Sequence, residues 1–269
     1  MHNFKLSLYL LLITILTCSC SLLKETPNIP KPEMVKVEGG TFFMGDIIDS
    51  LNTDALPIHE VTLNDYYIGK YEITFEQYDA FAQQTKRPLP SDRDYGRGTR
   101  AVVYVNWHDA LAYCNSLGWR LPTEAEWEFA ARERGQNMRY SGTNNPDSLE
   151  KYAITKLSNI EFSYFVGSRK PNALGLFDMS GNVMEYVGSF YQEYDKPHDI
   201  YPIEKRGVRI LRGGSFQEPI IESAQTFWRV GSYDLMTHSD VGFRCAVSQE
   251  ELNKQRFLNG FFHFKPAKL

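Results

Sequence analysis

The residues of this 269-residue chain that could do chemistry gather in one segment of its C-terminal third. Arg212-Gly213-Gly214-Ser215 is followed by a carboxylate at Glu218, a hydroxyl at Ser223 and the pair Trp228-Arg229. Serine hydrolysis would need a histidine and an acid to activate the hydroxyl, and no such relay is evident beside either serine. Tryptophan next to arginine is a common anchor for a bound peptide or sugar. Ser215, Trp228 and Arg229 therefore define a candidate binding groove.

Composition and histidine spacing argue against two other classes of function. Lys and Arg total 29 against 33 Asp and Glu, which gives a net charge of -4, and there is no block of basic residues. A nucleic-acid partner is therefore not expected. The histidines have no spacing typical of a metal site, and each is more typical of a structural or exposed side chain. The histidines between residues 34 and 248 are His59, His108, His198 and His238.

The N-terminus has the pattern of an export signal. Lys5 supplies a positive charge before the apolar stretch 6–17, which is too short to cross a bilayer as a helix. Cys20, preceded by Ser19, stands where bacterial lipoprotein signals place the lipid-bearing cysteine, and Cys18 is the alternative. We expect an exported protein, lipid-anchored in the bacterial cell envelope and located at the outer membrane. An uncleaved anchor or a simple secretory signal is the other interpretation.

The rest of the chain divides into a tether, one domain and a tail. With 42% hydrophobic residues the chain can bury one substantial core. After the signal peptide and its cysteine at 1–20, residues 21–33 contain three prolines and suit a tether. The domain is then expected at 34–248, and residues 249–269 form a charged C-terminal tail.

The elements that must position these side chains can be located by local signals. Thr74, Asn106 and Thr123 each stand three residues before an acidic or amide side chain, which predicts three capped helices. Alternating apolar and polar residues predict short strands at 35–38, 59–63 and 66–68, the first ending in a turn at Gly39-Gly40. Periodicity fades between 132 and 170, where long loops are expected.

Four motifs in this order resemble the sulfatase-modifying factor family, whose founding members are the formylglycine-generating enzymes. The resemblance runs from about Met34 to Val247, nearly all of the chain after the signal. It implies an α+β, loop-rich variant of the C-type-lectin-like fold, with short antiparallel sheets and two or three helices. The motifs are Arg120-Leu121-Pro122-Thr123-Glu124-Ala125-Glu126-Trp127-Glu128, Gly181-Asn182-Val183-Met184-Glu185-Tyr186, Arg212-Gly213-Gly214-Ser215 and Val241-Gly242-Phe243-Arg244-Cys245-Ala246.

The resemblance fails at the two positions that carry the family's oxidase chemistry. Family members have a cysteine pair there, which binds copper(I) and the substrate thiol, whereas this chain has Glu218 and Ser223. Soft thiolates select copper(I), and a carboxylate and a hydroxyl cannot replace them. No catalytic residue is therefore assigned, and no copper is expected.

This loss favours a non-catalytic envelope lipoprotein that holds a protein or glycan partner. By fold and anchor it resembles the lipoproteins of gliding and protein-secretion machinery that carry this domain. The alternative is an enzyme, either an atypical sulfatase-maturing oxidase or a catalyst that uses other residues of the same cleft. A third interpretation is a protein that binds sulfatases without modifying them.

The resemblance also implies one calcium ion. In the family a glycine turn binds calcium through main-chain carbonyls and a glutamate, and calcium favours such oxygen ligands at about 2.3–2.6 Å. The other interpretation is that the glutamate caps main-chain N–H groups. The matching positions are Gly181, Asn182, Val183 and Glu185.

A disulfide is the last feature that the resemblance implies. Cys114 and Cys245 are the cysteines that remain after the signal, and they match a structural pair of the family. An exported chain can keep such a bridge. Two buried free thiols are the alternative.

Overall fold

The computed structural model of the chain describes residues 29–194 and 207–254. The predicted lipid-attachment cysteine Cys20, its alternative Cys18 and most of the predicted tether and tail lie outside the described residues. Within the described ranges, no helix is long and apolar enough to cross a membrane.

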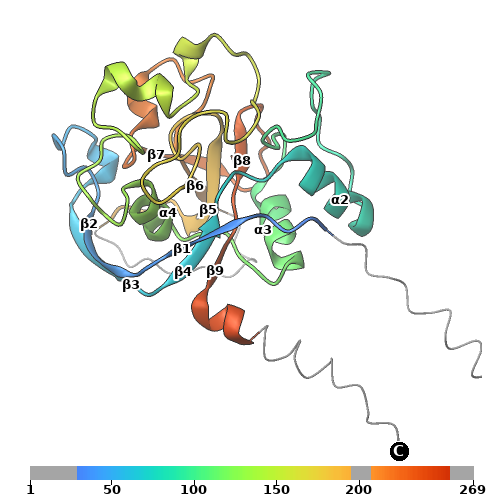
Figure 1. Cartoon of the computed structure of the whole chain (residues 1–269), viewed down its shortest axis with the longest axis horizontal. Coiled ribbons are helices and arrows are strands. Elements are labelled where there is room, and N and C mark those ends of the chain that lie inside the picture. Colours follow the sequence, from blue (N-terminus) through green and yellow to red (C-terminus); the bar gives the residue numbers. More distant parts are fainter. Residues whose placement is uncertain (1–28, 195–206, 255–269) are drawn as a thin grey trace, which may run out of the picture.

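The described strands form three small sheets (Figure 1). In the first, β4 lies between β1 and β9 and is antiparallel to both. In the second, β2 and β3 form an antiparallel pair. The third has the order β7-β6-β5-β8. The strands are β1 (Met34–Val37), β2 (Gly40–Met44), β3 (His59–Leu63), β4 (Tyr66–Gly69), β5 (Met184–Phe190), β6 (Val208–Arg212), β7 (Arg229–Tyr233), β8 (Val241–Phe243) and β9 (Ala246–Ser248).

Three α-helices begin where the caps predict them. The side chains of Thr74, Asn106 and Thr123 each accept a hydrogen bond from the backbone N–H three residues on, and a side chain of that residue bonds back to the cap. In each case the two hydrogen bonds satisfy backbone N–H groups at the start of the helix, which have no partner within the helix itself. The helices are α2 (Phe75–Thr85), α3 (Trp107–Ser116) and α4 (Glu124–Ala131). Short 3₁₀ turns are also present: η2 (Thr53–Ala55), η3 (Pro146–Lys151), η4 (Lys156–Ser158) and η5 (Ile221–Ala224).

The four-stranded sheet is buried on both faces, because successive side chains of a strand point to opposite sides. Tyr186 and Leu211 pack into an apolar cluster with α2 and α3. Their neighbours Val187 and Ile210 pack into a second cluster with α4. Figure 1 shows α2 and α3 together to the right of this sheet and α4 to its left. Strand β6, which ends at Arg212, is therefore packed between two apolar clusters.

The mixed α+β, loop-rich fold is the predicted one, but two details differ. β5 and β8 are parallel, although antiparallel sheets were expected. The chain crosses from the β7 edge to the β8 edge over residues 234–240, so β8 enters the sheet in the direction of β5. The sequence predicts a turn at Gly39-Gly40, but in the structure Gly40 begins β2 and is paired with Leu63 of β3.

The predicted disulfide is present. Cys114 of α3 and Cys245, which lies between β8 and β9, are joined with a Cα–Cα distance of 5.6 Å. Both side chains are fully buried in the cluster beneath α2 and α3. The bridge therefore connects a central helix to the last strands of the domain.

Candidate functional site

Two glycines after β6 bring the candidate site together. Gly213 and Gly214 have φ values of 96° and 68°, in the left-handed region that glycine adopts without strain. A Cβ atom on Gly214 would lie 2.7 Å from the backbone carbon and oxygen of Ser223. The turn therefore needs glycine at 214, and it places Ser223 directly against the end of β6.

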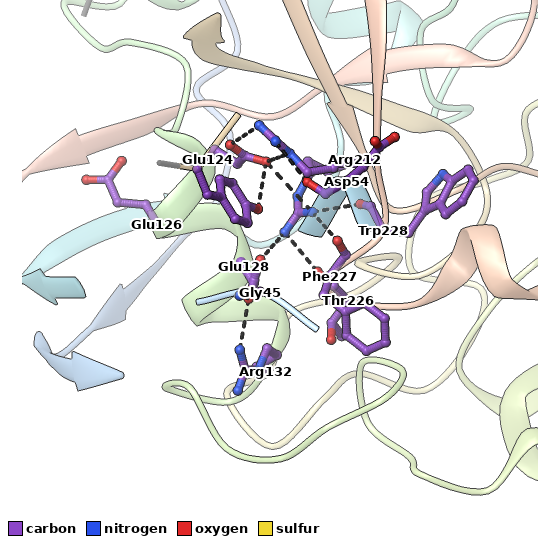
Figure 2. Close-up of polar contacts among 12 residues, drawn as sticks. Gly45, Asp54, Glu124, Glu126, Glu128, Arg132, Arg212, Thr226, Phe227 and Trp228 are labelled. Atoms are coloured by element: carbon purple, nitrogen blue, oxygen red, sulfur yellow. Dashed lines mark hydrogen bonds and ion pairs between the residues drawn. The ribbon is translucent and has the colours of Figure 1, made fainter. Parts of the chain in front are cut away.

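Arg212 holds the segment that follows Ser223. Its side chain is completely buried, and its guanidinium donates to three successive loop carbonyls and to the carboxylate of Glu128 on α4 (Figure 2). Arg212 is thus a buried arginine that binds loop carbonyls. The acceptors are the carbonyl oxygens of Thr226 at 3.0 Å, Phe227 at 2.9 Å and Trp228 at 2.7 Å.

The hydroxyl groups of both candidate serines are already engaged. Ser215 Oγ donates to Asp240 Oδ2 at 2.7 Å, and Ser223 Oγ donates to the carbonyl of Ile220 at 2.8 Å. Both serines are buried, each with 2% exposure. Neither has a histidine partner among the described residues, so the structure provides no relay that would make either of them a nucleophile.

Glu218 lies in a half-buried position near Asp240. Burial raises the pKa of the Glu218 carboxyl, and the negative charge of Asp240 raises it further. The sequence predicts no role for Asp240. The one sequence feature that points to it is its position immediately before the Val241 motif. The carboxylate and hydroxyls of this segment are hard oxygen ligands, so they do not suit a soft copper(I) ion.

Arg229 is not available to a partner. It is 2% exposed, and its Nε and Nη2 donate to the carboxylate of Glu124 at 2.7 and 2.9 Å. Its Nη1 donates to the carbonyls of Asp54 and Gln192. The neighbouring Trp228 is half-buried, and its indole N–H has no hydrogen-bond partner within the described part of the chain. Figure 2 shows the Trp228 side chain directed away from the Arg212 contacts. The two residues do not form a joint anchor.

The predicted calcium turn is closed by internal contacts. Gly181 has a φ of 81°, and a Cβ there would lie 2.3 Å from the carbonyl oxygen of Ile154. Asn182 accepts from the backbone N–H of Tyr164 at 2.8 Å and donates to Glu72 at 2.6 Å. The N–H of Val183 also donates to Glu72. These hydrogen bonds hold the turn against Glu72 and Tyr164.

Glu185 is similarly engaged, and this limits its use as a metal ligand. Its Oε2 accepts from Trp127 Nε1 at 2.9 Å and Arg244 Nε at 2.7 Å, while Oε1 accepts from Arg244 Nη2 at 2.6 Å. Within residues 29–194 and 207–254, no group of three acidic, histidine or cysteine side chains is arranged to hold a metal. These contacts do not fit a calcium shell centred on Glu185. Calcium stays a prediction of the sequence, and we derive no role for it.

Asp178, beside this turn, gives a pH-dependent prediction. Burial raises the pKa of its carboxyl to about 6, and the charge of Glu185 adds to the shift. Between about pH 4 and pH 6 the Asp178 carboxyl is therefore protonated in the folded state but ionised in the unfolded chain. The ionised carboxyl thus costs stability above pH 6, and this cost vanishes as pH falls below the unfolded pKa.

We expect Asp178→Asn to raise the free energy of unfolding at pH 7.5 by up to about 3 kcal/mol. Near pH 4 it should match the wild type. Asparagine suits the φ of 57° at this position and can still accept the hydrogen bond from Gly167 N. Urea denaturation between pH 4 and 8 measures the difference. A gap that stays constant over this range would show that the Asp178 charge is not the cause.

Comparison with known proteins agrees with the family resemblance of the sequence motifs. A model of the sulfatase-modifying factor enzyme 1-like domain matches residues 19–249. The inactive C-alpha-formylglycine-generating enzyme 2 of Bos taurus is 28% identical over 87% of this chain and 94% of its own length. The chaperone protein LppX of Paenibacillus barcinonensis is 29% identical over 65% of this chain and 78% of its own.

Enzymes and a solved structure are also among the similar proteins. They include the formylglycine-generating enzyme of Streptomyces coelicolor. The solved structure of PvdO from Pseudomonas aeruginosa superposes with a TM-score of 0.70 and 28% identity, over 84% of this chain and 99% of that one. The chain is thus similar in sequence both to a protein named as an enzyme and to one named as inactive.

Proposed function

Since the chain belongs to the sulfatase-modifying factor family, we propose that it is a non-catalytic member that binds a protein or glycan partner. The observation that carries this proposal is the pair Glu218 and Ser223 at the family's cysteine positions. The two cysteines of the domain, Cys114 and Cys245, are joined to each other inside the core. No free thiol is therefore present among the described residues to bind copper(I) or to exchange with a substrate thiol.

Two relatives support a binding role. One carries the description inactive in its name, and another is named a chaperone. The fold of this family can therefore persist without the oxidase reaction, because its scaffold and its reacting residues are separate. In this chain Arg212 keeps its contacts with the loop carbonyls, while Glu218 and Ser223 stand where the family has its reacting thiols.

We place this binding domain in the cell envelope, held to a membrane by lipid on Cys20. The export signal supports this location, and the disulfide agrees with a compartment outside the cytoplasm. A multiply acylated cysteine gives stable anchoring, since burial contributes roughly 0.8 kcal/mol per CH₂. The partner is then a protein or glycan that meets the domain at the membrane surface.

A copper and peptide assay tests the loss of the oxidase reaction. We expect the purified domain to show no tight copper(I) binding in a competition titration. It should also leave a cysteine-containing sulfatase peptide unchanged in the presence of oxygen, as measured by mass spectrometry. The matched variant Glu218→Cys/Ser223→Cys should gain copper(I) binding, because it restores two soft ligands at the family positions. Oxygen-dependent formation of formylglycine by the wild type would falsify the proposal.

A further inference from the structure

A cavity of about 300 Å³ opens beside the Arg-Gly-Gly-Ser segment and was not indicated by the sequence. Its volume is at the lower end for small-ligand sites. Three parts of the chain line it: the 92–104 loop, the turn at 161–163, and the ends of the two segments that carry Ser215 and Asp240. The lining includes Arg93, Tyr95, Arg100, Glu161, Phe162 and Gln217.

Aromatic rings form one wall of the cavity. Tyr95 and Phe162 are stacked, with ring centroids 4.5 Å apart and planes inclined by 20°. Tyr95 remains 48% exposed, although most large apolar rings of the domain are buried. An exposed, stacked ring gives a flat and rigid surface that can cover the apolar face of a ligand.

Polar side chains surround this wall, and their charges balance. Two arginines and two acids line the cavity, so neither sign prevails. Arg100 is 2% exposed, and its nitrogens donate to Gly96 and Ser163 within the fold. It therefore shapes the floor of the cavity and is not free to pair with an anion.

The ligand-facing groups offer both donors and acceptors. Arg93 Nε donates to Tyr104 Oη at 2.7 Å, and this bond holds the guanidinium group at the edge of the cavity. Gln217 and Ser239 are hydrogen-bonded to one another at 3.1 Å. Glu161 is exposed at the rim. An arginine, an amide, a hydroxyl and a carboxylate thus converge on a site with an aromatic wall.

We infer that this cavity binds a neutral sugar residue of a glycan. The inference rests on the proposed binding function, and it names the chemistry of the ligand. A sugar ring has one face of C–H groups, which stacks on an aromatic ring, and an edge of hydroxyls, each of which both donates and accepts. An anion would require unbalanced positive charge, and an apolar peptide side chain would leave the charged rim without partners.

Saturation-transfer NMR and calorimetric titration with neutral disaccharides test the inference. The probes are cellobiose, maltose, chitobiose and mannobiose, with a glucuronate-containing disaccharide and a neutral tetrapeptide as competitors from other classes. At least one neutral disaccharide should bind. Tyr95→Ala should weaken that binding by about tenfold, whereas Tyr95→Phe should retain it because the ring remains.

Two further variants separate the cavity from the rest of the surface. Glu161→Gln should also weaken binding of the neutral disaccharide, because it removes a charged hydrogen-bond acceptor from the rim of the cavity. Tyr233→Ala should not, although Tyr233 is 69% exposed, because it does not line the cavity. The inference is overturned if no neutral disaccharide binds, if Tyr95→Ala leaves binding unchanged, or if the acidic sugar or the peptide binds in preference. None of these results bears on the copper and peptide assay, so the proposed loss of oxidase activity is judged independently.

Discussion

Replacing Arg212 by methionine is expected to lower the free energy of unfolding by about 3–5 kcal/mol. Arg212 and Glu128 both have completely buried side chains, and the guanidinium is also the donor to three loop carbonyls. Methionine fills a similar space but donates no hydrogen bond, so the carbonyls lose their partner and Glu128 is left with Arg132 and the N–H of Gly45. Urea denaturation followed by tryptophan fluorescence measures the loss.

An exposed ion pair provides the matched control. Arg134 pairs with Glu38 at 3.4 Å, and the two side chains are 45% and 67% exposed. Arg134→Met should therefore change the free energy of unfolding by only about 0–1 kcal/mol. The double variant Arg212→Met/Glu128→Gln should be less destabilised than the sum of its single changes, because each single change already breaks the same Arg212–Glu128 ion pair. Equal losses for Arg212→Met and Arg134→Met would contradict a special role for the buried pair.

Removing the disulfide is the second change with a large expected effect. Cys114 and Cys245 are separated by 131 residues, and closing so long a loop stabilises the folded chain by about 5 kcal/mol in the chain-entropy model. Measured losses for native bridges are typically about 2–5 kcal/mol. We expect Cys114→Ala/Cys245→Ala to lose free energy of unfolding within this range, with part of the loss due to the emptied sulfur positions in the core.

Reducing agent supplies the control for this variant. The wild type in dithiothreitol should approach the stability of the double alanine variant, whereas the variant should be insensitive to the reagent. Chemical denaturation with and without reductant gives both values. A wild type whose unfolding midpoint does not move on full reduction, verified by thiol titration, would show that loop closure contributes little to this domain.

Local elements could be predicted from the sequence because their signals are local. Thr74, Asn106 and Thr123 each bond to a residue three positions away, so the cap and its partner can be identified together. The family motifs added the overall fold and the pairing of Cys114 with Cys245. The start of β2 at Gly40 could not be predicted in the same way, because a glycine pair more often marks a turn and the pairing with Leu63 is made across 23 residues.

The site was harder to predict because its contacts span long separations. Arg229 was interpreted as a partner anchor, and nothing near it in sequence indicates that Glu124, 105 residues earlier, takes its guanidinium. The family resemblance implied a calcium ligand at Glu185, while Arg244, 59 residues later, binds both of its oxygens. The cavity combines loops between Asp92 and Ser239 that show no common pattern. Such groupings arise from the folded chain and are visible only there.

The way in which Arg212 binds the chain after Ser223 has a consequence for how this scaffold can vary. Its acceptors are backbone carbonyls, so the bonds do not depend on which side chains residues 226–228 carry. The atoms nearest to a Cβ on Gly214 would likewise be backbone atoms, those of Ser223 and Ala224. A change of side chain at position 218 or 223 therefore leaves these backbone contacts in place, so the reacting positions can vary while Arg212 and Gly214 keep the path of the loop.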